Sequence, residues 1–207
     1  APWQIDIHQN ARETFVELTP KLRPDPRFSY RRQDVPAASH PPLAAAMARL
    51  AGHMQNEVVW DPFCGSGLEL IECALRGGVA RVIGTDRSAD AIQITEQNFQ
   101  SALSRDVTAR FVCSDFRDHA RVAGLEQGSV SLIISNPPMG RRVPIPNLPG
   151  LIKDLFIAAA QVLKPGGRLI FANPLPVAPM GLPLKRDYQQ KVDLGGFSVH
   201  VERYTRL

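Results

Sequence analysis

The stretch from residue 58 to residue 75, VVWDPFCGSGLELIECAL, decides the fold. An apolar run ends at Asp61, a loop of small residues follows, and apolar residues at helical spacing begin at Leu68. This order predicts a strand, a tight loop and a helix. Gly65 and Gly67 lack a Cβ, so the loop can take a positive φ and let a ligand approach the helix N-terminus closely. An ordinary strand-to-helix turn would carry the same glycines, so the rest of the chain must decide.

Length and composition favour one globular domain. The 207 residues are 44% apolar and 21% charged, as in ordinary soluble proteins. No apolar stretch is long enough to span a bilayer and no signal peptide is recognisable, so we expect a cytoplasmic location. The net charge of +4 permits a polyanionic partner without requiring one.

The cysteines and histidines point away from a metal site. Their spacing matches no set of metal ligands, so no metal is expected. The three cysteines are an odd number and lie in stretches expected to be buried or close to the loop. We therefore expect reduced thiols.

The first 27 residues are predicted to form a separate unit. Residues 3–8 alternate like a strand, and residues 14–18 form a second short run that would pair with them. Three prolines then stiffen a linker. The chain also starts with Ala1 rather than methionine. We expect residues 1–27 to be the tail of a missing upstream domain and residues 28–207 to form the main domain.

Strands and helices alternate after the glycine loop, which is typical of a parallel sheet covered on both faces. The expected strands are residues 58–61, 81–86, 109–113, 130–135 and 168–172. The expected helices are residues 43–51, 68–75, about 89–103 with Ser88 as cap, and 148–163. A breaker cluster at residues 164–167 should separate the last helix from the next strand. Residues 173–183 should form a loop, and residues 191–204 two strands joined at Gly195 and Gly196. The prediction is an α/β, doubly wound, mostly parallel seven-stranded sheet with a C-terminal antiparallel strand.

Polar side chains follow four of these strands, at Asp61, Asp86, Asp115 and Asn136. They should line one edge of the sheet, where open α/β proteins bind ligands. Asp86 lies roughly 20 residues beyond the glycines, where a carboxylate can accept hydrogen bonds from ribose hydroxyls. Asp115, with Phe116 beside it, can hold the amine of an adenine against a ring. Surface, cap or turn positions are the ordinary alternatives for these carboxylates.

Two other nucleotide-binding loops fit less well. A dinucleotide-binding loop needs a third glycine for helix packing, but residues 68–70 are Leu, Glu and Leu. A phosphate-binding Walker loop needs Gly-Lys-Ser or Gly-Lys-Thr, which the sequence lacks.

The sequence Asn136-Pro137-Pro138 carries the chemistry. Two prolines fix a rigid turn, whose carbonyls and Asn136 oxygen can accept both hydrogens of a planar NH₂ group. Such a nitrogen is a poor nucleophile because its lone pair is delocalised. Holding both protons aims that lone pair at an electrophile, so catalysis would rest on positioning and electrostatics. Alone, the motif is more often just a rigid loop; its place behind the glycine loop favours catalysis.

Residues 61–67 together with residues 136–138 resemble the class I S-adenosylmethionine-dependent methyltransferases that act on exocyclic or amide nitrogens. A narrower likeness is to the RNA guanine-N2 methyltransferases whose catalytic domain follows a THUMP RNA-binding domain. Residues 30–32, 37–46 and 136–142 carry it, and it extends over about residues 28–172.

The resemblance implies a Rossmann-like methyltransferase fold and direct in-line transfer of a methyl group from S-adenosylmethionine to guanine N2 in RNA, with tRNA expected. It implies cofactor binding by Ser39, His40, Asp61, Phe63, Cys64, Gly65, Ser66, Gly67, Asp86, Arg87, Asp115, Phe116 and Asn136. It implies catalysis by Asn136, Pro137, Pro138 and Met139, and substrate binding by Arg31, Arg32, Gly140, Arg141 and Arg142. No nucleophilic cysteine is needed, so Cys64 and Cys113 are expected to be packing residues. The upstream domain would be RNA-binding; without it, Lys185, Arg186 and Arg203 would join in RNA capture.

One departure keeps alternatives open. Many amine methyltransferases carry an aromatic residue after the two prolines, where this chain has Met139, whose thioether packs less strongly on a base. Methylation of DNA adenine N6 or of protein glutamine uses the same turn. A cofactor-binding but inactive RNA-binding or partner module is a further alternative.

Overall fold

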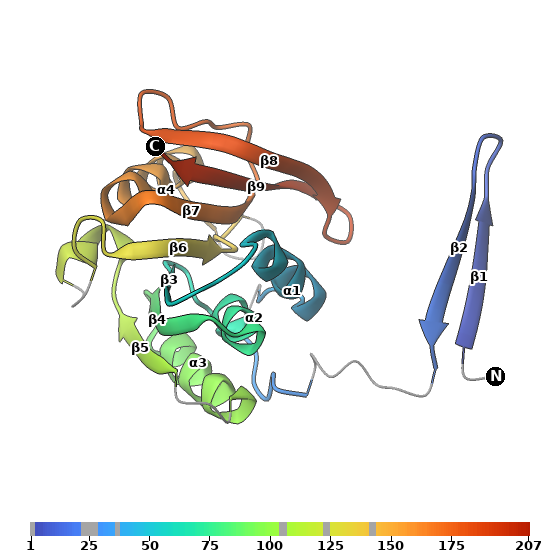
Figure 1. Cartoon of the computed structure of the whole chain (residues 1–207), viewed down its shortest axis with the longest axis horizontal. Helices are drawn as coiled ribbons and strands as arrows, with labels where there is room; N and C mark the ends of the chain where they lie inside the picture. Colours follow the sequence, from blue (N-terminus) through green and yellow to red (C-terminus); the bar gives the residue numbers. More distant parts are fainter. Residues whose placement is uncertain (1–2, 22–28, 36–37, 104–106, 122–124, 141–143) are drawn as a thin grey trace.

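The computed structural model describes residues 3–21, 29–35, 38–103, 107–121, 125–140 and 144–207. In these residues the strands form a separate two-stranded sheet and a seven-stranded sheet with helices on both faces (Figure 1). The strands of the larger sheet are β3 (Glu57–Asp61), β4 (Val79–Asp86), β5 (Thr108–Cys113), β6 (Val130–Ser135), β7 (Leu163–Asn173), β8 (Leu184–Asp193) and β9 (Ser198–Arg206).

The seven strands lie in the order β5-β4-β3-β6-β7-β9-β8. Neighbours from β5 to β7 are parallel, and β9 runs antiparallel to both β7 and β8. The predicted α/β fold, with a mostly parallel seven-stranded sheet and an antiparallel C-terminal strand, is confirmed. The order reverses between β3 and β6, which is where ligands bind in such sheets.

The helices divide between the two faces of the sheet. They are α1 (Pro41–Leu50), α2 (Leu68–Arg76), α3 (Ala89–Ala102), α4 (Leu148–Val162) and the 3₁₀ helix η2 (Phe116–Arg121). Successive strand residues point to opposite faces. Val59 accordingly packs in one core with residues of α1, α2 and α3, whereas Trp60 packs in a second core with residues of α4 and η2. No described helix has the length and apolar character needed to cross a membrane.

The expected strands and helices up to residue 162 end within two residues of the observed ones. Residues 164–167, expected to be a loop between helix and strand, instead belong to a strand. Strand β7 starts at Leu163 and includes residues 164–167, because Leu163 already pairs with Val130 of β6. The chain folds closely here, since a Cβ on Gly167 would lie 2.8 Å from the Lys164 carbonyl oxygen. The sequence prediction of a break between helix and strand was therefore wrong.

Strand β8 also begins earlier than predicted, at Leu184 instead of residue 191. Most of its side chains are exposed and polar, as on an edge strand, so the strand has no apolar alternation to reveal it. The predicted pair of strands on either side of Gly195 and Gly196 is found as β8 and β9.

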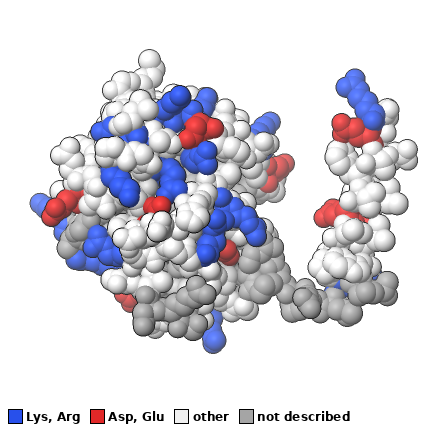
Figure 2. Space-filling view, in the orientation of Figure 1, with Lys and Arg blue, Asp and Glu red and all other residues white. Residues whose placement is uncertain are grey.

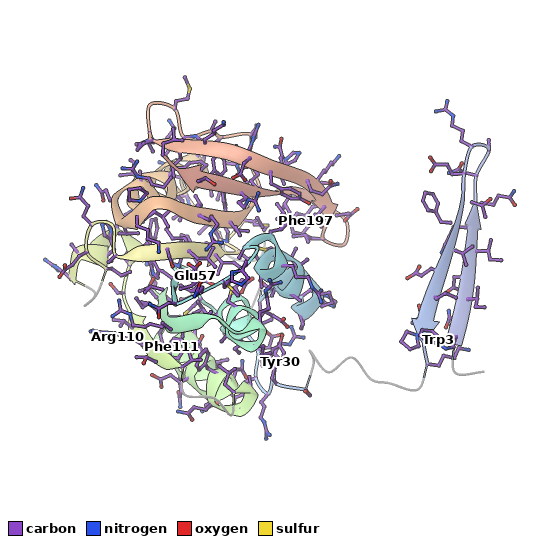
Figure 3. The ribbon with its side chains drawn as sticks, viewed as in Figure 1. Trp3, Tyr30, Glu57, Arg110, Phe111 and Phe197 are labelled. Atoms are coloured by element: carbon purple, nitrogen blue, oxygen red, sulfur yellow. The ribbon has the colours of Figure 1, made fainter. Side chains whose placement is uncertain are left out.

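Strands β1 (Trp3–Gln9) and β2 (Thr14–Pro20) pair antiparallel as an N-terminal hairpin. It stands apart from the larger sheet in Figure 1, with Trp3 labelled in Figure 3. Its large apolar side chains are 51% to 66% exposed, namely those of Trp3, Ile5, Ile7, Phe15, Val16 and Leu18. The assignment of residues 1–27 to the tail of an upstream RNA-binding domain stays a prediction.

Residues 29–40, here called the strap, are held against α2 and α3 in their described parts. The fully buried Asn98 of α3 accepts hydrogen bonds from the backbone N–H groups of Arg32 and Gln33, at 3.0 and 3.2 Å. Its amide nitrogen donates to the carbonyls of Gln33 and Ser66, at 3.0 and 2.9 Å. The Tyr30 hydroxyl donates to the Glu72 carboxylate on α2. One asparagine thus joins the strap to the glycine loop.

Replacing Asn98 with alanine should lower the free energy of unfolding by about 1–3 kcal/mol, because buried backbone groups lose their partners. Urea unfolding of the purified chain measures this. Gln100 is an exposed amide on the same helix, and Gln100→Ala should stay within about 0.5 kcal/mol of wild type. Equal effects of the two substitutions would contradict the role given to Asn98.

Candidate active site

Asp61 ends β3 as a buried carboxylate shared between two strand ends. Its Oδ1 accepts the Ser135 hydroxyl of β6 at 2.6 Å and the Phe63 backbone N–H at 3.0 Å. Its Oδ2 is buried and has no hydrogen-bond partner among the described residues. Burial raises the pKa of Asp61 well above its usual range, and the nearby Glu69 carboxylate adds to the shift, while the Ser135 bond opposes it. Asp61 therefore fixes where the glycine loop leaves the sheet.

The glycine loop takes the left-handed conformation expected of it. Gly65 has φ of 52° and Gly67 has φ of 84°. A Cβ on Gly67 would lie 3.0 Å from the methyl carbon of Thr95, whose hydroxyl donates to the Gly65 carbonyl at 2.7 Å. The Gly65 N–H donates to Asp86 at 3.1 Å, and Ser88 N–H donates to the other carboxylate oxygen at 2.9 Å. The loop and Asp86 are thus adjacent, as a nucleoside site over this loop requires.

Asp115 lies beyond the end of β5, between two arginines. The Arg87 guanidinium lies 3.9 Å from its carboxylate and the Arg117 guanidinium 3.2 Å from it. Phe116 is only 3% exposed, and its ring lies 4.8 Å from the ring of Phe63. The Phe116 ring belongs to the core, so Phe63, which is partly exposed, is the more accessible ring of this pair.

The cysteines divide differently from the expectation. Cys64 and Cys73 are buried, and burial raises the pKa of both thiols, so they suit packing roles. Cys113 is exposed, and the prediction that it would be a packing residue was wrong. It lies at the end of β5, an edge strand whose side chains are only partly covered.

Asn136 follows β6 and is held by a chain of buried side chains. Its amide nitrogen donates to the Ser39 hydroxyl oxygen at 2.9 Å, and that hydroxyl donates to the Glu69 carboxylate. Ser39 and Glu69 are 6% and 4% exposed. Burial raises the pKa of Glu69, the hydrogen bond from Ser39 opposes the shift, and the Glu72 carboxylate adds to it. The Asn136 Oδ1 is buried and, among the described residues, unpaired. The acceptor capacity of this oxygen is therefore unused among the described residues.

A cavity of about 1180 Å³ opens beside this asparagine. The strap and α1 form one side of it, and the end of the β8–β9 hairpin forms another; Phe197 lies there, toward α1 (Figure 3). Its lining includes Ser39, His40, Asn136, Pro137, Pro138, Met139, Tyr188 and Phe197. The structure thus brings the expected catalytic turn together with Ser39 and His40. The glycine loop reaches the same sheet edge through Asp61, Ser135 and Asn136.

The arginines proposed for RNA binding are only partly available. Arg31 lines the cavity, but its guanidinium donates to the Ser39 carbonyl at 3.2 Å and lies 3.4 Å from Asp34. The Arg32 side chain is exposed, as is Gly140. Arg141 and Arg142 lie outside the described residues.

The other basic candidates lie on the C-terminal strands. Arg186 pairs with Glu202 at 2.9 Å, and Arg203 pairs with Asp187 at 2.6 Å. Lys185 is exposed. Lys and Arg atoms are spread over the visible face of the larger sheet unit, with some Asp and Glu among them (Figure 2).

Several site residues were not predicted from the sequence, chiefly Glu69, Asn98 and the aromatic pair Tyr188 and Phe197. Helix α2 carries Glu69, Glu72 and Arg76 at a spacing typical of a solvated face, so the sequence gives no sign that Glu69 is buried. The aromatic pair could not be predicted either, because the pairing of β8 with β9 brings it to the cavity.

Comparison with known proteins agrees with this geometry. The UPF0020 family model, described as "RMKL-like, methyltransferase domain", matches residues 29–175. The tRNA (guanine(10)-N2)-dimethyltransferase of Methanothermobacter thermautotrophicus is 30% identical over 169 residues, which cover 79% of this chain and 44% of that protein. The U6 snRNA (guanine-N(2))-methyltransferase THUMPD2 of Bos taurus is 28% identical over 176 residues, covering 81% of this chain and 33% of that protein.

Among solved structures, TrmN from Thermus thermophilus is similar with a TM-score of 0.75 and 26% identity, over 99% of this chain and 60% of that chain. The chain spans less than half the length of the Methanothermobacter thermautotrophicus and Bos taurus enzymes. The match to the family model takes in most of the chain, from the strap to the loop after β7. The chain therefore belongs to the RMKL-like methyltransferase domain family.

Proposed function

We propose that this chain transfers a methyl group from S-adenosylmethionine to the exocyclic N2 amine of a guanosine in RNA, with tRNA as the expected substrate. The observation that carries the proposal is the buried Oδ1 of Asn136, which follows β6 beside the large cavity and has no hydrogen-bond partner among the described residues. The names of the relatives, which are guanine-N2 methyltransferases acting on tRNA or U6 snRNA, support the same chemistry.

The residues at the sheet edge fit the cofactor. Asp86 lies beside the glycine loop, where its carboxylate would accept the ribose hydroxyls, and the buried Asp61 would help to hold the methionine end. Asp115 and Phe63 would contact the adenine. S-adenosylmethionine, when bound, supplies an electrophilic methyl group.

Asn136 would act on the acceptor amine by accepting one of its hydrogens, while a carbonyl of the proline turn accepts the other. Both bonds keep the lone pair of the amine aimed at the methyl carbon. Methyl transfer would leave the cofactor sulfur as a thioether, and the surplus proton of the methylated amine would pass to water. The contribution of the chain is positioning and electrostatic stabilisation, without a covalent intermediate.

The target base would enter the cavity flipped out of its RNA helix. The volume of about 1180 Å³ exceeds what one nucleoside needs. Met139 would pack on one part of the base, and Tyr188 and Phe197 offer aromatic faces in the same cavity. RNA contacts by Arg32, Arg141 and Arg142 and a cytoplasmic location remain predictions, as does an upstream RNA-binding domain.

Radioactive methyl transfer followed by nucleoside analysis tests the proposal. Purified chain with labelled S-adenosylmethionine should label N2-methylguanosine in tRNA, and mass spectrometry of tRNA from cells with and without the gene should show the same nucleoside change. Label in DNA adenine or in protein glutamine would support the other acceptors. Cofactor binding without any labelled product would favour an inactive binding module.

Replacing Asp86 with alanine should weaken S-adenosylmethionine binding by about tenfold to hundredfold, because the hydrogen bonds to the ribose hydroxyls are lost. Calorimetry measures the affinity. Asp90 is an exposed aspartate in the first turn of α3, and Asp90→Ala should bind as wild type does. An unchanged affinity in Asp86→Ala would refute the ribose contact.

Replacing Asn136 with alanine should lower the rate of methyl transfer to RNA by about a hundredfold or more, because the amine loses an acceptor aimed at it. The affinity for the cofactor should change by less than about threefold, since Asn136 acts mainly on the acceptor. Single-turnover transfer and calorimetry give the two values. Retained turnover would show that Asn136 is not catalytic.

A further inference from the structure

The hydrogen-bond chain behind Asn136 has a direction. A serine hydroxyl carries a single proton, and the Ser39 proton goes to the Glu69 carboxylate. The Ser39 oxygen can then only accept from Asn136, at 2.9 Å. An accepting serine selects the NH₂ end of the amide, so the Asn136 carbonyl oxygen is left as the end without a partner among the described residues.

We propose that Ser39 and Glu69 are positioning residues that fix the Asn136 amide with its oxygen presented to the acceptor amine. This inference rests on the proposed methyl transfer for its kinetic part. An unrestrained amide can turn over, and its NH₂ would then meet the N–H groups of the substrate, donor against donor. Because a buried partner holds the amide before the substrate binds, its conformational entropy is not lost again in each turnover.

The surroundings of Ser39 and Glu69 favour a positioning role for them over a role in packing alone. Placing a carboxylate at Glu69, at 4% exposure, costs stability that an apolar side chain would not cost. The backbone of Ser39 is itself held, because the Arg31 guanidinium donates to its carbonyl at 3.2 Å. The strap therefore places the Ser39 hydroxyl between Glu69 and Asn136.

The kinetic test uses Ser39→Ala and Ser39→Thr. Ser39→Ala should lower kcat for RNA methylation about tenfold to hundredfold, as loss of a residue supporting a reactive group does. KM for RNA and the calorimetric affinity for S-adenosylmethionine should change less than about threefold, because the Ser39 hydroxyl is engaged by Glu69 and Asn136 and not by either ligand. Ser39→Thr keeps the hydroxyl and should recover most of kcat.

Two further variants separate positioning from folding. Ser131 is a buried serine whose hydroxyl bonds only to the Val58 backbone among the described residues, so Ser131→Ala should lose stability but keep kcat. Glu69→Leu removes the acceptor of the Ser39 proton and a buried carboxylate together. It should lower kcat while the midpoint of urea unfolding stays or rises. A wild-type kcat in both Ser39→Ala and Glu69→Leu overturns the proposal and leaves methyl transfer standing.

A measurement on the chain without substrate tests the orientation directly. The side-chain NH₂ protons of Asn136, assigned in ¹⁵N-labelled chain by their loss in Asn136→Ala, should exchange slowly with water in wild type. They should exchange at least about tenfold faster in Ser39→Ala, which removes their acceptor. Equal exchange rates would overturn the proposal, even if the wild type proved to methylate no RNA.

Discussion

The hydrogen bond from Ser135 to the buried carboxylate of Asp61, at 2.6 Å, is the contact on which the site depends. It joins the ends of β3 and β6, the neighbouring strands between which the strand order reverses. The connections that follow two such parallel strands lead to helices on opposite faces of the sheet, which opens a crevice between the two loops. The bond therefore sets the distance between the glycine loop, which follows Asp61, and the turn at Asn136, which follows Ser135.

Most of the fold could be predicted from the sequence because its central strands contain short apolar runs and finish at a polar residue, as at Asp61, Asp86, Ser135 and Asn173. The runs around Trp60 and Ile133 are buried on both faces, so hydrophobicity alone marks them. What hydrophobicity does not report is pairing. Strand β8 lies at the sheet edge, and its side chains are therefore polar and exposed. The residues before Arg168 belong to β7 because Leu163 pairs with Val130 of β6.

The candidate site could be predicted where a motif carries its own chemistry, as with the glycine loop and Asn136. The supporting polar residues could not, because their roles come from contacts between segments far apart in the chain. Asn98 and Glu69 occupy ordinary helical positions, and their partners come from the folded strap and, for Asn98, also from Ser66 of the glycine loop. Ser39 was expected beside the cofactor, yet its hydroxyl is already engaged between Glu69 and Asn136.

The strap has a consequence for the motions of the molecule. A single segment contacts Asn98, which also holds the glycine loop, and contacts the turn at Asn136 through Ser39, so opening of the strap would release both halves of the candidate site. Local opening of this segment would cost few apolar contacts, because its described apolar side chains are the buried Tyr30 and the half-buried Val35 and Ala38. Ordering of the strap would thus set both contacts in one step, and an opened form would lose both contacts at once rather than one after the other.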